Sequence, residues 1–217
     1  GLVVGLGYYF GGQNGAMIAF FISLFMNFTS YWFSHQIVLS MYRAKEMKEH
    51  EYPKVHQMIE ELSRNSGLIK PKLYMVDMPV PNAFATGRNE KNSVVALSSA
   101  IINLLSDEEL RGVLAHELSH IKNKDILIST IAATLAGTIS YIAQMVYFNG
   151  GNRDGRNNVF AVMAMAIVTP IIAGILRMAI SRSREYLADE TGARMAKDSS
   201  GLSSALKKLH SYSEGNK

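Results

Sequence analysis

Residues 106–122, SDEELRGVLAHELSHIK, predict an α-helix with a defined start and a buried position. Ser106 followed three residues later by Glu109 forms a capping box, and Asp107 and Glu108 suit the positive end of the helix dipole. Apolar side chains then surround the helix on nearly every side: Val113, Leu114, Ala115, Leu118 and Ile121. We therefore expect this helix to lie in the core of a domain.

The same helix carries the pattern H-E-x-x-H, in which His116 and His120 stand four residues apart. This spacing places both imidazoles on one helix face, where they can bind one Zn²⁺, with Glu117 beside them to act on a water molecule. Burying two histidines is unfavourable unless a partner such as a metal compensates. The sequence contains no cysteine, so zinc fingers, iron–sulfur clusters and cysteine nucleophiles are excluded.

A third metal ligand must come from elsewhere, because the extended metzincin pattern needs Gly and His where the sequence has Asn123 and Ile126. Glu185 and Asp189 are candidates, since they stand four apart on an expected helix. One of them can bind zinc while the other accepts a hydrogen bond from a ligand histidine. A solvated charged face beside two neighbouring arginines is equally compatible with this spacing.

The region around the helix, residues 42–125, has the composition of a folded soluble domain. It contains twelve Lys and Arg and twelve Asp and Glu. An amphipathic helix is expected between Pro53, which suits a first helical turn, and Gly67, which suits a stop. Short strands are expected over 72–76, 83–85 and 93–97, and their turn-rich connections predict a small antiparallel sheet.

The flanking segments are apolar enough to cross a bilayer. Spans are predicted over 15–41, 126–148 and 159–180, and residues 1–10 are expected to be the end of a truncated transmembrane helix. A buried helical hairpin of a soluble protein is the alternative for the later spans. Residues 42–125 carry twelve Lys and Arg and the segment after Leu176 carries eight, against two in the 149–158 loop, so both should face the cytoplasm. The net charge of +4 is dispersed, so nucleic acid is not an expected partner.

Several ordered motifs together resemble the HtpX family of bacterial membrane zinc metalloproteases, to which the CAAX prenyl proteases are related. The matching segments are NAFATG at 82–87, LAHELSH at 114–120, the turn at 151–154, Ser181–Arg182 and 185–189. The resemblance implies an α+β membrane protein. It would have a mainly helical zincin-like domain, a small antiparallel sheet and about four transmembrane helices.

The resemblance also assigns the site. His116, His120 and Glu185 would bind one zinc per subunit, Glu117 would be catalytic, and Asp189 would contact a ligand histidine. Residues 181–217 would form a cytoplasmic helix with the third ligand and a truncated C-terminal tail, without a later segment that lines the family's active site.

The implied activity is peptide-bond hydrolysis by zinc-activated water. The expected role is stress-responsive quality control of misfolded membrane proteins in the bacterial inner membrane, so misfolded substrates and the lipid bilayer are the expected partners. A CAAX-type prenyl protease and a catalytically weak zinc-binding scaffold are the alternatives. Residues 94–97 are expected to be an edge strand that binds extended substrate, through Val94 and Ala96, and Asn82 is expected near substrate. Ordinary sheet packing and turn formation explain these three residues almost as well.

Overall fold

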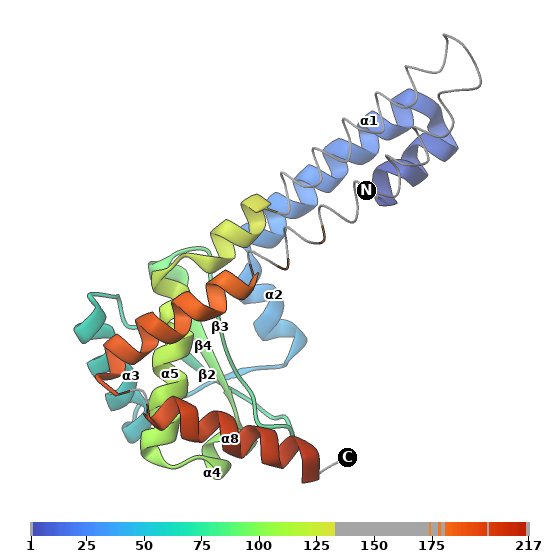
Figure 1. Cartoon of the computed structure of the whole chain (residues 1–217). Coiled ribbons are helices and arrows are strands. Elements are labelled where there is room, and N and C mark those ends of the chain that lie inside the picture. The colour runs from blue at the N-terminus through green and yellow to red at the C-terminus, as the bar shows by residue number, and fades with distance from the viewer. Residues whose placement is uncertain (1, 133–173, 175–177, 179–180, 199, 216–217) are drawn as a thin grey trace. The chain divides into compact units, whose positions relative to one another are not determined.

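The computed structural model describes residues 2–132, 174, 178, 181–198 and 200–215 (Figure 1). The chain divides into two compact units, one formed by Gly1–Ser30 and Ile128–Arg182, the other by Tyr31–Leu127 and Ser183–Lys217. The second unit contains every candidate site residue. It joins the expected domain and the C-terminal segment into one body.

The N-terminal helix α1 (Leu2–Trp32) consists of two helical segments joined at Gly11 and Gly12. Gly12 has φ of 58°, a left-handed value that favours glycine. Among the described residues one helix, Val3–Trp32, is long and apolar enough to cross a membrane, and most of its large apolar side chains are exposed. The sequence predicts one helix to residue 41, but Phe33 separates α1 from α2 (Ser34–Met41).

Two predicted spans, 126–148 and 159–180, lie mostly outside the described residues. Within these spans the structure describes residues 126–132, 174 and 178, and these are helical. Their assignment as membrane spans stays a prediction.

Four strands form one sheet in the order β1-β2-β4-β3. They are β1 (Lys45–Glu46), β2 (Lys72–Val76), β3 (Ala83–Thr86) and β4 (Val94–Ser98). β4 pairs antiparallel with β3 but parallel with β2, so the sheet is mixed and the predicted purely antiparallel sheet is wrong. The reason is that β2 and β3 run in opposite directions, so β4, which lies between them, is parallel to one and antiparallel to the other. The two-residue β1 is too short to leave a pattern in the sequence.

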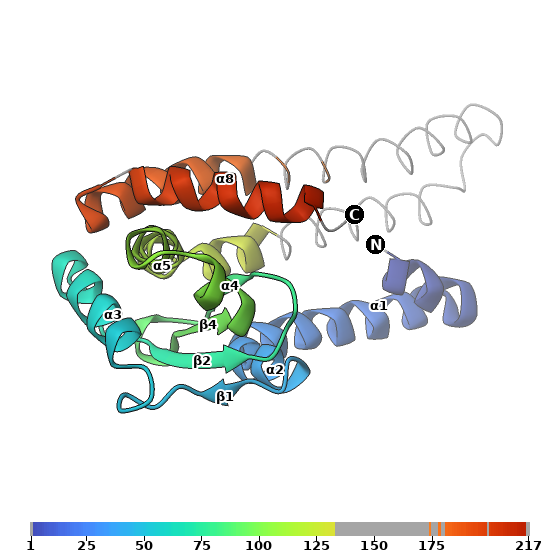
Figure 2. The same ribbon diagram turned by 90° about the horizontal axis from the view of Figure 1, so that it is seen from below.

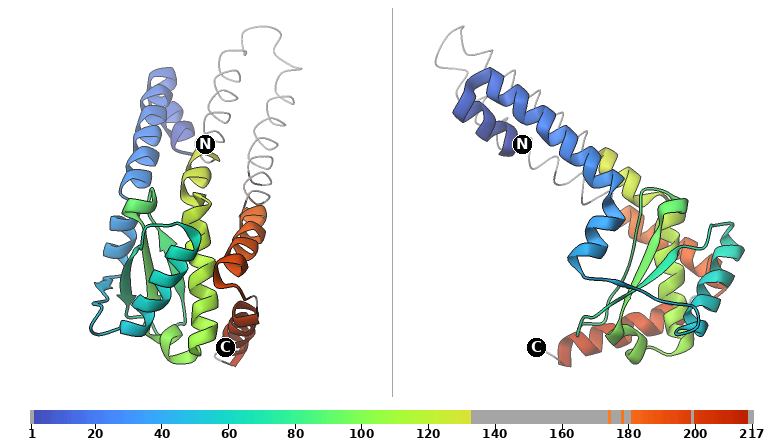
Figure 3. Two further views of the ribbon diagram at one scale, coloured as in Figure 1. Left: turned by 90° about the vertical axis from the view of Figure 1, so that its left-hand side faces the viewer. Right: turned by 180° about the vertical axis from the view of Figure 1, so that it is seen from behind.

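Helices cover the sheet and form the core with it (Figure 2). They are α3 (Pro53–Ser66), α4 (Ser99–Leu104), α5 (Asp107–Lys122), a helix over 181–196, and α8 (Ser200–Gly215). The predicted α3 and α5 are confirmed, including the left-handed Gly67 after α3 and the capping box of α5. Figure 3 shows α5 between the sheet on one side and the two C-terminal helices on the other.

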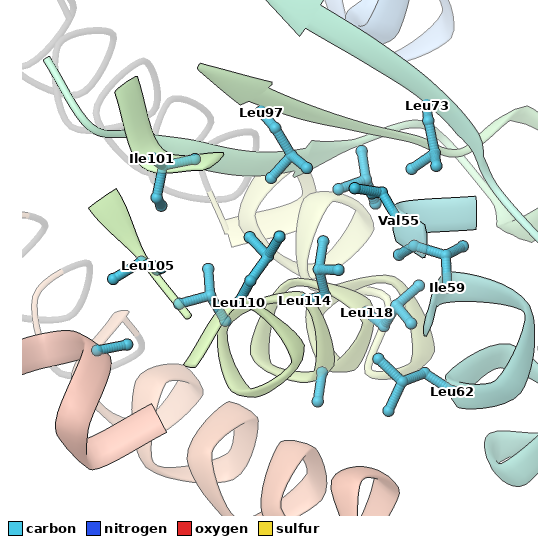
Figure 4. Packing of buried hydrophobic residues seen from close by; sticks show 14 of the residues in the cluster. Val55, Ile59, Leu62, Leu73, Leu97, Ile101, Leu105, Leu110, Leu114 and Leu118 are labelled. Carbon is cyan, nitrogen blue, oxygen red and sulfur yellow. The ribbon is translucent and has the colours of Figure 1, made fainter. Parts of the chain in front are cut away.

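The core lies between α5, α3 and the sheet. Leu110, Leu114 and Leu118 of α5 face Leu97 of β4 and the α3 side chains (Figure 4). Leu114 and Leu118 are completely buried. This packing fixes α5 rigidly against the sheet, and with it the histidines that α5 carries.

Candidate metal centre

His116 and His120 lie one turn apart on α5, and their Nε2 atoms are 3.2 Å from each other. Both side chains are largely buried, 17% and 21% exposed. His120 Nδ1 lies 2.6 Å from Asp125 Oδ2, and His116 Nδ1 lies 2.9 Å from Asp189 Oδ1. Asp125 is hydrogen-bonded to His120 Nδ1, and the Asp189 carboxylate lies at ion-pair distance from His116 Nδ1; a carboxylate on this side of the ring favours the proton on Nδ1 and leaves Nε2 with a lone pair.

The helix over 181–196 brings a carboxylate to these two nitrogens. Glu185 Oε2 lies 3.6 Å from His116 Nε2, and one donor atom from each of His116, His120 and Glu185 lies within 4.8 Å of the others. Gly192 allows the close approach of this helix, since a Cβ there would lie 3.1 Å from the backbone N of His116. The side chain of Glu185 is 59% exposed, so the centre opens towards solvent on this side.

The donor set fits a zinc ion. Tetrahedral zinc with bonds of about 2.0–2.1 Å separates its ligand atoms by about 3.3–3.4 Å, close to the 3.2 Å and 3.6 Å observed. Two imidazole lone pairs that face each other repel unless a cation lies between them. Two histidines and one carboxylate also leave a fourth position free, as in catalytic zinc sites.

Burial and neighbouring charges shift the titration of two groups at the centre. Burial lowers the pKa of His116, and the charge of His120 lowers it further, against the opposing effect of Asp189 and Glu185. Burial raises the pKa of Glu117 to about 7, although His120 and the Ala85 N–H favour its charged form. A carboxyl group with a pKa near neutrality can both accept and return a proton.

Glu117 connects the centre to the edge of the sheet. The backbone N–H of Ala85 in β3 donates a hydrogen bond to Glu117 Oε2 at 2.9 Å. Among the strands that the structure describes, β3 pairs with β4 alone, so it is the edge strand next to the centre. Because N–H groups alternate along a strand, Ala83 points its backbone groups in the same direction as Ala85.

The prediction that residues 94–97 form the edge strand is wrong, because β4 lies inside the sheet. Val94 and Ala96 are 3% and 0% exposed, and their strand has partners on both sides. Asn82 directly precedes β3, and its backbone exchanges hydrogen bonds with Ser98. Contact of its side chain with substrate stays a prediction.

Sequence reasoning missed two residues of the centre. The sequence pattern does not single out Asp125 as a site residue, yet Asp125 contacts His120, because the turn at Asn123 and Lys124 returns the chain to α5. Arg184 reads as part of a solvated face, yet its side chain is 19% exposed and contacts Asp125. An acidic residue just past the end of the H-E-x-x-H helix is the signal that would have pointed to the first of these.

Comparison with known proteins decides the family. Residues 49–215 match the profile of peptidase family M48, a range that includes the whole centre. The chain belongs to peptidase family M48. It is 52% identical over 214 residues to a protease HtpX homolog of Persephonella marina, covering 96% of this chain and 74% of that protein. It is 50% identical over 222 residues to the HtpX homolog of Aquifex aeolicus, covering 98% and 74%.

The M48 chain also resembles the crystal structure of S. mikatae Ste24p, with a TM-score of 0.63 and 16% sequence identity. The match covers 94% of this chain and 52% of the other, so the chain spans about half the length of that protein. At this identity the likeness concerns the fold alone. The resemblance to the HtpX family is confirmed, and the protein is an M48 metallopeptidase whose His116, His120 and Glu185 are consistent with a zinc site.

Proposed function

We propose that this protein is a membrane-bound, zinc-dependent endopeptidase. One zinc per chain would be held by His116, His120 and Glu185, with Glu117 as the general base. The observation that carries the proposal is the convergence of two Nε2 atoms at 3.2 Å, each imidazole having a carboxylate at its other nitrogen. Glu117 follows His116 directly in α5 and accepts a hydrogen bond from Ala85 of the edge strand β3, which supports its role as the general base.

A zinc ion at this site would lower the pKa of the attacking water and polarise the scissile carbonyl. Glu117 takes the proton of the attacking water and delivers it to the departing amine. The Ala85 N–H holds the Glu117 carboxylate in place, and the backbone groups of Ala83 together with the Ala85 carbonyl, which point away from β4, would bind an extended substrate by strand addition. An additional strand at β3 would run past the centre.

We assign the protein to the bacterial inner membrane, with the M48 unit in the cytoplasm and misfolded membrane proteins as substrates. The apolar α1 and the distribution of Lys and Arg support this topology. The edge strand β3, where substrate would bind, also ends close to Tyr31 and Trp32, the last residues of α1. Arg88, two residues after β3, lies over the Trp32 ring at 4.1 Å, and Tyr31 Oη donates to the Arg88 carbonyl at 2.9 Å.

Casein cleavage by the detergent-purified, zinc-loaded protein tests the proposal, beside its Glu117→Gln variant. Glu108→Gln is a matched control, because Glu108 is an exposed glutamate on the same helix. We expect cleavage by the parent and by Glu108→Gln, and none by Glu117→Gln, with one zinc bound in all three. Cleavage by Glu117→Gln at the parental rate contradicts the role of Glu117. Cleavage of prenylated peptides alone favours a CAAX-type protease, and zinc binding without any cleavage favours a scaffold.

A further inference from the structure

The helix that carries Glu185 reaches α5 only through tertiary contacts, because residues 123–180 separate the two helices in the chain. Its placement therefore depends on particular side chains. Asp189 contacts His116 near the middle of α5, and Gly192 packs against the backbone of His116. Met195 of the same helix packs in the core. Arg184 makes a further contact, at the end of α5, and it lies next to Glu185 in the chain.

Arg184 binds two oxygens at the end of α5. Its Nη1 donates to Asp125 Oδ1 at 2.7 Å and to the Asn123 carbonyl at 3.2 Å. Asn123 is the C-cap of α5, so this carbonyl is one of those left without a partner inside the helix. A cation is also favourable at the negative end of a helix dipole.

Asp125 shares its two oxygens between Arg184 and His120. Oδ1 accepts from Arg184, while Oδ2 lies 2.6 Å from His120 Nδ1. The side chains of Asp125 and Arg184 are 11% and 19% exposed, so water screens this pair little. The chain of contacts from Arg184 through Asp125 ends on His120, a candidate zinc ligand. Glu185, another candidate ligand, follows Arg184 directly in the sequence.

We infer that Arg184 is a positioning residue of the metal centre: its contacts with Asp125 and Asn123 set the placement of both His120 and Glu185, and so the affinity for zinc. This inference rests on the proposed zinc site. Without the arginine, the Asp125 carboxylate loses its cation and is free to turn away from His120. The helix over 181–196 also loses its attachment to the end of α5.

The test compares zinc dissociation constants of the full chain, by competition with a chromophoric chelator, for the parent, Arg184→Gln and Arg194→Gln. Arg194 is the matched control, because it lies on the same helix but is exposed and pairs with Glu190 of that helix. We expect Arg184→Gln to weaken zinc binding about 10- to 100-fold, as is usual for residues that orient ligands. Arg194→Gln should change it less than about twofold.

Circular dichroism of the metal-free proteins checks that each variant is folded. Parental zinc affinity in folded Arg184→Gln overturns the inference and leaves the proposed function intact, whereas a parent that binds no zinc overturns both. Should Arg184→Gln not fold, Arg184→Lys replaces it: lysine keeps the charge but not the guanidinium geometry, so weakened binding is expected and parental affinity overturns the inference. Combining Arg184→Gln with Asp125→Asn should cost less than the product of the two separate losses, and fully independent losses contradict the route through Asp125.

Discussion

Replacing Gly192 with alanine should weaken zinc binding while leaving the protein folded. A Cβ at this position would lie 3.1 Å from N and Cα of His116 and 3.2 Å from the carbonyl carbon of Ala115. These are backbone atoms of a well-packed helix and cannot rotate away. The helix over 181–196 must therefore move outward by about 0.3 Å or more to restore ordinary contact.

The displacement reaches the metal centre directly, because Asp189 and Glu185 lie one and two turns before Gly192 on the same helix face. The ion-pair contact of 2.9 Å between Asp189 Oδ1 and His116 Nδ1 would lengthen by a similar amount and weaken. We expect a loss of zinc affinity of about tenfold. Alanine gains about 1 kcal/mol of helix propensity, and overpacking costs about 1–3 kcal/mol, so the free energy of unfolding should fall by about 0–2 kcal/mol.

Chelator competition measures the zinc affinity and urea unfolding of the metal-free protein measures the stability. Gly215→Ala is the control, since Gly215 lies on α8 with open space where its Cβ would be. That variant should keep parental zinc affinity. If Gly192→Ala also binds zinc like the parent and is more stable than it, the close approach of the two helices does not hold the ligands, and the reasoning fails.

Two further predictions concern stability. Leu114 is completely buried between α3 and the sheet, so Leu114→Ala should lower the free energy of unfolding in urea by about 2–5 kcal/mol, and a loss below about 1 kcal/mol contradicts the described core. Lys208, then Ser204 and Ser106, lower the pKa of Glu109 to about 2 from its usual 4.5. The stabilisation from ionised Glu109 is therefore complete above about pH 4.5 and lost as the pH falls towards 2. Melting temperatures over this range should fall more steeply for the parent than for Glu109→Gln, and equal slopes contradict the assignment.

The local signals in the sequence were sufficient for the helices but not for the sheet topology. Pro53, Gly67 and the capping box at Ser106 act within a few residues, so α3 and α5 follow from the sequence. The order of the strands depends on contacts across tens of residues. Nothing in residues 94–98 indicates that β4 inserts between β2 and β3, and this is why an interior strand was taken for the edge.

The residues of the metal centre likewise fall into those that local spacing predicts and those that depend on tertiary contacts. His116, Glu117 and His120 share one helix, so their spacing alone predicts their common face. Glu185 and Asp189 follow from the sequence only with the help of the resemblance, because spacing leaves a solvated face equally compatible. Arg184 depends on how a helix far along the chain docks against the end of α5, and single-sequence patterns contain no such information.

Zinc-edge X-ray absorption of the zinc-loaded protein tests the central claim most directly, because it reports the ligands independently of activity. The account predicts two imidazole nitrogens per zinc, with carboxylate and water oxygens completing a four-coordinate shell at about 2.0–2.2 Å. Replacing His120 with alanine should remove one imidazole or the zinc itself. A spectrum with fewer than two imidazoles in the parent, or one unchanged in the His120 variant, would contradict a zinc site at this pair.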